Sequence, residues 1–274
     1  MKKLLDIEII KTLGYPAFKA VIGIHAVLFL IVAVFASGIN IDFQGITLDK
    51  LFQFPHVWSM FAWISSWFNL LLGIVAIILI TNELQFRTFR KHLIDGLTRN
   101  ELLYGKLMVF FFVALYTMLL VFVTGLIIGA VKSTSFSFVD FVDGLPILPV
   151  LFFQSLAYML LAMLFAFIFR GTALSIVSFI LFFFPVEPMV RWFFPAPADQ
   201  FFPIKIISNL TPMPDFFGIT LGDVIKIQGG TSADAYSMGI MDKPLPLIAT
   251  VAIAVGYSLI FILVSQFIVK RRNF

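Results

Sequence analysis

Residues 107–131 read LMVFFFVALYTMLLVFVTGLIIGAV, an apolar run without a single charged side chain. About 20 such residues in a helix cross the roughly 30 Å hydrocarbon core of a bilayer, so this run predicts a transmembrane helix. Similar runs occur before and after it. Together they predict six spans, at about 18–37, 56–81, 107–131, 145–169, 172–194 and 247–269.

The composition of the whole chain agrees with this interpretation. Of its 274 residues, 61% are hydrophobic and 12% are charged, whereas soluble domains average about 45–50% and about 25%. So few charged residues cannot cover a soluble protein of this size. We therefore expect a single all-α membrane domain over residues 1–274 and exclude a soluble enzyme. The chain contains no cysteine, which excludes disulfides and thiolate metal sites.

Basic residues are distributed unevenly around the spans. Most lysines and arginines lie at the N-terminus, in the 82–106 connection, at Arg170 and at the C-terminus. The positive-inside rule places these segments in the cytoplasm, so we expect both termini there and expect the bacterial cytoplasmic (inner) membrane as the location. The asymmetry accounts for the net charge of +4 without nucleic-acid binding. The basic leader is too long for the n-region of an ordinary signal peptide, so we expect the first span to stay uncleaved.

Two connections are long enough to carry function, the cytoplasmic 82–106 and the outer segment 195–245. The first reads NELQFRTFRKHLIDGLTRNELLYGK. Asn82 with Gln85 three residues later predicts a helix start, and Gly96 suits the left-handed residue after a helix end. Thr98 with Glu101 predicts a capping box that opens the third span. We therefore expect a structured elbow at the membrane surface.

The predicted elbow helix is amphipathic. Phe86, Phe89 and Leu93 recur at helical spacing, whereas Arg87 and Lys91 lie on another face. Two interpretations stay open at this point. The helix can rest its apolar face among lipid headgroups, with its basic face on anionic lipid. Alternatively it docks a cytoplasmic protein, for which a mixture of aromatic residues and arginine is typical.

The order of residues in the elbow resembles the segment between the second and third helices of type 2 ABC-transporter permeases. That segment contains a Glu, a Gly-Thr pair, a leucine-rich stretch, a Pro-x-Ser/Thr-Arg turn and a Gly-Lys. Arg87 and Leu97 stand where the family usually has glycine and proline. The matching residues are Glu83, Thr88, Arg90, the IDGLTR run at 94–99, Glu101, Gly105 and Lys106.

This resemblance implies the permease subunit of an ATP-driven exporter, whose residues 83–97 include a coupling helix seated in a separate ATPase subunit. It also implies an N-terminal surface helix and short re-entrant extracellular helices before the last span. The implied partners are two ATPase copies, a second permease chain, identical or homologous, and membrane lipid. The residues that would dock the ATPase are Glu83, Phe86, Arg87, Thr88, Phe89, Arg90 and Lys91.

Motifs that are missing from the sequence constrain the chemistry. No Gly-x-x-x-x-Gly-Lys-Ser/Thr motif occurs, so ATP and Mg are expected in the partner, with no cofactor in this chain. No catalytic or metal-ligating set is apparent, and we expect a non-catalytic subunit. Two alternatives stay open. An ion-coupled secondary transporter would need buried ionisable residues and paired broken helices, and a membrane-embedded lipid-modifying enzyme would need a catalytic constellation.

Two further features suggest sites inside the membrane region. Small and polar residues recur along the second span and predict either a substrate path or a helix-packing stripe. Glu187 is a candidate outer gate, or else an interfacial glutamate that faces water and pairs with Arg191. The prolines on either side of Glu187 predict a kink or a reversal in the outer third of the fifth span. The stripe comprises Ser59, Trp63, Ser66 and Asn69.

Overall fold

The computed structural model describes residues 2–39, 42–43, 46–86, 88–134, 137–195, 198–214 and 245–271. Apart from a two-residue antiparallel pairing of β1 (Asp42–Phe43) with β2 (Ile46–Thr47), the regular structure in these ranges is helical. Five helices are long and apolar enough to cross a membrane, which indicates an integral membrane protein. A bent helix pair adds a sixth candidate if it is counted as one span.

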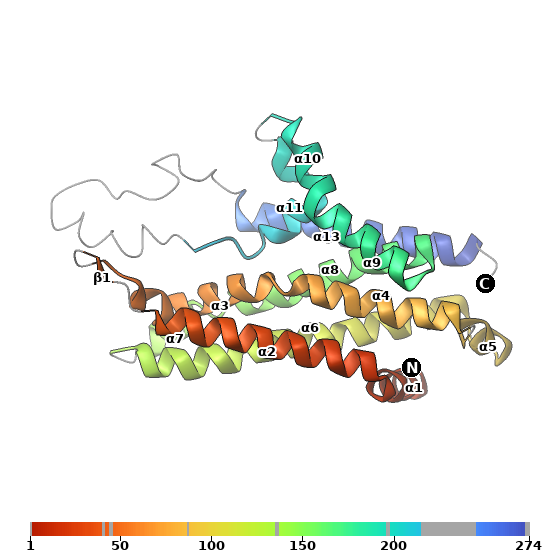
Figure 1. The fold of residues 1–274 in the computed structure, drawn as a ribbon, viewed down its shortest axis with the longest axis horizontal. Helices are drawn as coiled ribbons and strands as arrows, with labels where there is room; N and C mark the ends of the chain where they lie inside the picture. The colour runs from red at the N-terminus through yellow and green to blue at the C-terminus, as the bar shows by residue number, and fades with distance from the viewer. Residues whose placement is uncertain are drawn as a thin grey trace.

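The long helices run side by side as a bundle (Figure 1). Three of them, α2 (Pro16–Gly38), α8 (Ile147–Phe169) and α13 (Leu247–Arg271), match the predicted spans closely, because uniformly apolar segments satisfy their backbone only as helices in lipid. The helix of the third predicted span, α6 (Arg99–Lys132), ends as predicted but begins eight residues earlier, at its capping box, and extends for 34 residues, about 50 Å.

The second predicted span is broken. In place of one helix over 56–81, α3 (His56–Ser66) and α4 (Asn69–Gln85) meet at an angle of 47°. The Ser66 hydroxyl donates to the Trp63 carbonyl at 2.7 Å, and such back-bonding bends helices. Next to it, the Trp67 and Phe68 N–H groups bond three residues back, to Ile64 and Ser65, which tightens the chain to 3₁₀ geometry.

The fifth span contains the predicted proline irregularity but does not reverse. After α9 (Thr172–Leu181), residues Phe182–Val186 form a π-helical turn that includes Pro185, and the helix then continues as α10 (Glu187–Trp192). A π turn is one way in which a helix accommodates a proline that cannot donate a backbone hydrogen bond. Figure 1 shows that α10 projects away from the bundle.

Helix α8 is the central element. Its inward side chains, including Leu151, Tyr158 and Met159, are almost fully buried, and α4, α6, α9 and α13 all pack against it. Glycine allows one of the closest approaches, because a Cβ on Gly73 of α4 would lie 2.5 Å from the Phe179 ring of α9. A second apolar cluster, around Trp58 and Phe61 of α3, fills the end of the bundle near the strands.

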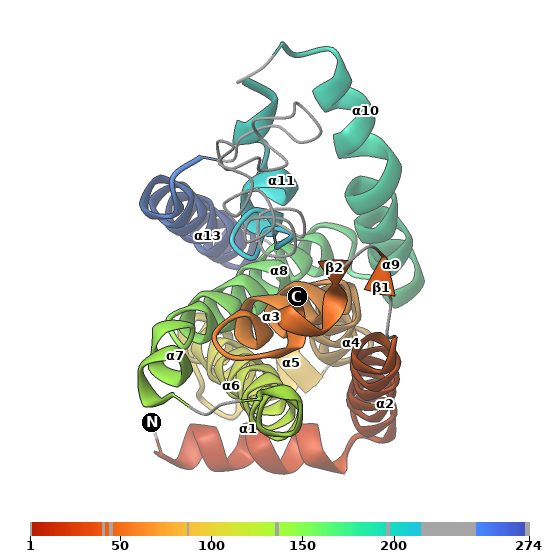
Figure 2. The same ribbon diagram turned by 90° about the vertical axis from the view of Figure 1, so that its left-hand side faces the viewer.

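Short elements surround the bundle. The N-terminal helix α1 (Lys2–Gly14) crosses one end of it nearly perpendicular to the long helices (Figure 2). The elbow helix α5 lies at the same end, as do both chain termini (Figure 1). Of the outer segment, residues 215–244 lie outside the described residues. The remaining short elements are α5 (Thr88–Ile94), α7 (Phe138–Asp143), α11 (Pro203–Ser208), and the 3₁₀ turns Leu48–Phe52 and Ala198–Phe201.

Candidate functional site

The elbow between α4 and α6 is a structured turn. Gly96 has a φ of 97°, and the Leu97 N–H donates to the His92 carbonyl at 3.0 Å, which closes the end of α5. Thr98 and Glu101 form the predicted capping box: the Glu101 N–H donates to the Thr98 hydroxyl, and the Thr98 N–H donates to the Glu101 carboxylate. Both features predicted for the exit of the elbow are therefore confirmed.

The predicted helix start at Asn82 is wrong. Helix α4 continues to Gln85, and the next helix begins at Thr88. The Thr88 hydroxyl donates to the Glu83 carbonyl at 3.3 Å, so it satisfies one of the carbonyls that the end of α4 leaves free. The helix extends past Asn82 because Glu83 is buried and bound by side chains from other helices.

The residues named for docking divide into two groups. Glu83 is 7% exposed and Phe89 is 4% exposed, and both point into the protein. Thr88 is half-buried, whereas Phe86, Arg90 and Lys91 are exposed. Arg87 lies outside the described residues. A partner at this end would therefore meet Phe86, Arg90 and Lys91, together with the exposed Ile94, while Glu83 and Phe89 hold the elbow to the bundle.

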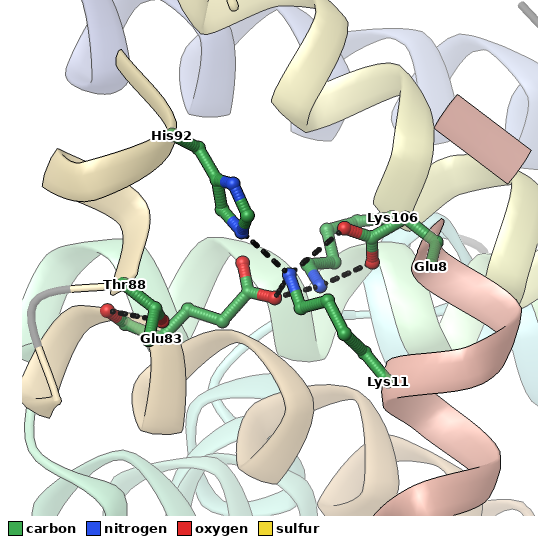
Figure 3. A network of polar contacts seen from close by, with 6 residues as sticks. All are labelled: Glu8, Lys11, Glu83, Thr88, His92 and Lys106. Carbon is green, nitrogen blue, oxygen red and sulfur yellow. Dashed lines mark hydrogen bonds and ion pairs between the residues drawn. The ribbon is translucent and has the colours of Figure 1, made fainter. Parts of the chain in front are cut away.

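Glu83 belongs to a cluster of four charges (Figure 3). The Lys106 ammonium donates to the Glu8 carboxylate at 2.5 Å and to the Glu83 carboxylate at 2.6 Å. Lys11 bonds the other oxygen of Glu8 at 3.1 Å and also pairs with Glu83. Two cations thus alternate with two anions, and they join α1, α4 and α6.

The cluster also reaches the elbow helix. The Lys11 ammonium lies 3.2 Å from Nε2 of His92 on α5. Because an ammonium group has only donors, the imidazole nitrogen acts as the acceptor in this contact. Together with the contact between Thr88 and Glu83, it connects α5 to the charge cluster. The N-terminal helix α1 and the three consecutive helices α4, α5 and α6 therefore meet at one point.

Burial makes this cluster sensitive to the loss of any member. Glu8 is 1% exposed and Lys106 is 4% exposed, and removing one partner of such a buried pair costs about 3–5 kcal/mol because a charge is left uncompensated. Partial burial acts to lower the pKa of Lys11, but the carboxylates of Glu83 and Glu8 outweigh it and raise the pKa above its usual value. Lys11 therefore stays charged at physiological pH, and its contribution to stability is lost only as alkaline pH rises through that raised pKa.

Backbone packing brings α1 into contact with α6 at this point. A Cβ on Gly105 would lie 3.0 Å from the Cγ of Glu8, so a glycine there allows the Glu8 side chain to cross α6 and reach Lys106. At the same end, the Arg99 guanidinium donates to the carbonyls of Val269 and Lys270, at 2.8 and 2.6 Å. A cation at a helix C-terminus is favourable, and this one attaches the end of α13 to the elbow.

The four residues of the polar stripe in the second span have different environments. Asn69 is fully buried. It accepts a hydrogen bond from Ser155 at 2.8 Å and donates to Gln154 at 3.3 Å, both on α8. Gln154 also accepts from Thr211 at 2.8 Å and donates to the Ile207 carbonyl at 2.9 Å. Asn69 thus packs helices together, whereas Ser59, Trp63 and Ser66 are half-buried.

One of the two interpretations of Glu187 required its carboxylate to face water, and the structure does not show this. It is 2% exposed, and its carboxylate accepts the backbone N–H groups of Ile204 and Lys205, at 3.0 and 2.8 Å. A carboxylate favours the N-terminus of a helix, here α11, because the first N–H groups have no partner within the helix. Glu187 therefore attaches the end of the fifth span to the short helix that follows.

The membership of the charge cluster was only partly foreseen. Glu83 and Lys106 were singled out as motif residues, but Glu8, Lys11 and His92 were not. The available signal was the i, i+3 spacing of Glu8 and Lys11 on a predicted helix. Among the described residues, no group of three or more histidines, aspartates or glutamates lies close enough together to hold a metal ion.

Comparison with models of known protein families finds no match for this chain, and comparison with curated protein sequences finds none either. A functional proposal therefore depends on the elbow, the charge cluster beside it and the exposed face of the elbow.

Proposed function

We propose that this chain is the membrane-spanning permease subunit of a type 2, exporter-like ABC transporter, and that it docks a separate ATPase through the exposed face of the elbow. The observation that carries the proposal is the joint formed by the charge cluster of Glu8, Lys11, Glu83 and Lys106, which connects α1, α4 and α6. The elbow helix α5 contacts this joint through His92 and Thr88. A force applied to α5 moves these helices together, because a packed joint of this kind transmits a displacement as a rigid body.

The exposed face of the elbow suits a protein partner. Phe86 is 73% exposed and Ile94 is 77% exposed, and they stand beside the exposed Arg90 and Lys91. Large apolar side chains exposed together on a surface are typical of interaction sites, and aromatic residues with arginine are typical of interface hot spots. Acidic and apolar residues on the ATPase would complement this face.

The membrane arrangement in this proposal has six spans, with α3 and α4 forming one bent span. An even number of spans returns both termini to one side, in agreement with their position at the same end as α1 and α5 (Figure 1). The basic residues concentrated there place this end in the cytoplasm. Helix α1 then lies along the cytoplasmic surface, and α11 is one of the short outer helices before the last span. The bacterial cytoplasmic membrane is the proposed location.

The mechanism follows from this geometry. Two permease chains, identical or homologous, would form the translocation unit together with two ATPase copies, which supply the ATP and Mg sites. Closure of the ATPases on ATP would push α5, and the joint would pass this displacement to α1, α4 and α6, shifting the bundle between inward- and outward-open states. Hydrolysis would reset it. The permease itself is non-catalytic.

Purification of the tagged chain from its native membranes tests this proposal. We expect a P-loop ATPase to come with it, identified by mass spectrometry and by ATP hydrolysis. The double variant Phe86→Ser/Arg90→Glu is expected to lose the ATPase while keeping its thermal unfolding transition, since both side chains are exposed. The matched control Phe267→Ser/Lys270→Glu, which changes an exposed phenylalanine and a lysine on α13, is expected to keep it.

Reproducible recovery of the wild-type chain without an ATPase, in a detergent that preserves a known ABC complex, would contradict the proposal. In that case the ion-coupled secondary transporter becomes the stronger hypothesis, and transport would be assayed for proton or sodium dependence. Equal loss of the ATPase in both double variants would show that binding depends on the overall charge of this end of the protein. It would contradict docking through the elbow.

A further inference from the structure

A groove lies beside the charge cluster, where α1 crosses α2 and α6. Its volume is about 340 Å³, within the range of roughly 300–1,000 Å³ typical of small-molecule sites. All but two of its lining side chains are hydrocarbon. Representative lining residues from the three helices are Ile9, Leu13, Ile22, Val109, Phe112 and Tyr116.

The few polar groups in the lining do not suit a polar ligand. Thr12 is 5% exposed. The Tyr116 hydroxyl donates to the Ile22 carbonyl at 3.3 Å, so its proton is already engaged within the wall. The surface that the groove offers to an occupant is therefore apolar. The apolar side of a membrane-spanning helix contacts lipid chains in place of water. A hydrocarbon chain is therefore the kind of ligand that suits this groove.

The charge beside the groove completes the pattern. Lys19 precedes Ile22 by three residues on α2 and is exposed. Within the described part of the chain, its ammonium makes no hydrogen bond or ion pair. Lys19 directly follows Phe18, which lines the groove. An apolar groove with an exposed cation next to a lining residue complements an amphiphile that has a hydrocarbon tail and an anionic head, and lysines near the cytoplasmic surface attract anionic lipid.

We propose that this groove binds one acyl chain of an anionic phospholipid, whose headgroup lies against Lys19. The bound lipid fills the space between the crosswise α1 and the spanning helices α2 and α6. It thereby supports α1, which carries Glu8 and Lys11 into the charge cluster. The inference does not depend on an ATPase partner, because it concerns only the membrane protein and its lipid.

Photo-crosslinking with a defined lipid tests the site. The purified full-length chain is reconstituted in phosphatidylcholine containing a trace of phosphatidylglycerol with a diazirine in one acyl chain, and the labelled peptides are mapped by mass spectrometry. We expect labelling on the groove-lining stretches of α1 and α6. Leu13→Trp and Ile9→Trp, which fill the groove from one wall, are expected to remove most of this labelling. Ile10→Trp, at a 72% exposed position on the same helix, is expected to leave it unchanged.

The headgroup is tested by charge reversal. Lys19→Glu is expected to reduce labelling by the phosphatidylglycerol probe by about fivefold or more, the factor that corresponds to one lysine near a membrane surface. The same change should not reduce labelling by a matched phosphatidylcholine probe, and Lys270→Glu should change neither. Lys19 and Lys270 are both exposed, so these variants are expected to fold.

Three results would overturn the proposal. The first is equal labelling of α1 and α6 in Ile9→Trp, Leu13→Trp and Ile10→Trp. The second is equal labelling by the two probes in both the wild type and Lys19→Glu. The third is conversion of a dimer to a monomer by Leu13→Trp with lipid labelling unchanged, which would show that a second copy of the chain covers the groove.

Discussion

Two buried polar clusters of this protein differ in their chemistry according to where they lie along the bundle. At the end that carries both termini, Glu8, Lys11, Glu83 and Lys106 form a network of full charges. Near the middle of the bundle, Asn69, Gln154, Ser155 and Thr211 form a network of amides and hydroxyls without a formal charge. Both networks connect helices that are distant in sequence.

The difference reflects the cost of charge at depth. A charged side chain at the centre of a bilayer costs about 2.5–3.5 kcal/mol on insertion scales, whereas an amide can hydrogen-bond across helices without that cost. Charges are tolerated at the end of the bundle because the headgroup region and water are near. The uncharged network therefore holds the middle of the bundle together, and the charged network forms the joint with the elbow. Breaking each network separately tests this division.

The largest effect is expected for Lys106→Met. This change removes the cation shared by Glu8 and Glu83 and leaves two buried carboxylates with only Lys11 as a partner. We expect the free energy of unfolding to fall by about 3–5 kcal/mol, measured by denaturant titration in detergent micelles. The exposed Lys270→Met serves as the control. Equal, small losses in the two variants would show that the cluster adds no stability.

Asn69→Asp sharpens the comparison from the other side, because it places a charge in the uncharged network. We expect the free energy of unfolding at neutral pH to fall by about 2.5–3.5 kcal/mol. Asn69→Ala, which removes the hydrogen bonds without adding charge, should cost less, about 1 kcal/mol. The aspartate and alanine variants are compared in the same titration, and an aspartate variant as stable as the wild type would mean that water reaches this depth.

A smaller effect is expected at the capping box of the elbow. Thr98→Ala removes the hydroxyl that accepts the Glu101 N–H and should cost about 1 kcal/mol of stability. Because the loss is confined to the start of α6, amide hydrogen exchange should rise there before it rises in the middle of the bundle. Asn100→Ala, in the same first turn, is the control. Unchanged exchange at residues 98–102 in Thr98→Ala would contradict the capping assignment.

The smallest effect is expected for Thr211→Val, which removes one of the two hydrogen bonds that the Gln154 carbonyl oxygen accepts. Hydrogen bonds between membrane helices average about 0.6 kcal/mol, and the loss should be of that size because Asn69 still donates to Gln154. Thermal unfolding of the variant and the wild type in the same detergent measures it. A loss of stability comparable to that of Lys106→Met would show that the uncharged network contributes as much to stability as the charged one.

Local patterns predicted much of the fold. The apolar runs predicted α2, α8 and α13 closely, and α6 except for its start. The Thr98 and Glu101 pair with Gly96 predicted the exit of the elbow, because capping depends on residues three or four apart. The break at 67–68 escaped prediction, since it arises from a serine back-bond that many continuous helices also tolerate. The start at Asn82 was predicted wrongly, since contacts of Glu83 with other helices extend α4 past a residue that favours a helix start.

The charge cluster was beyond local reasoning for a different reason. Glu8 and Lys106 are 98 positions apart, and a single sequence contains no signal that pairs residues over such a distance. Burial of Phe89 was also unexpected, because amphipathic periodicity identifies an apolar face without indicating whether that face meets lipid, a partner or the same chain. Phe86 and Ile94 of the elbow, in contrast, are exposed.

Site-specific crosslinking from the elbow tests the central claim most directly. A photoreactive amino acid is placed at Lys91, and at Lys270 as a control at the same end of the bundle, and both variants are irradiated in native membranes. The proposal predicts that position 91, but not position 270, crosslinks to a P-loop ATPase, with a yield that changes when ATP is added. Crosslinks from position 91 to lipid alone, with the ATPase absent at every ATP concentration, would contradict it.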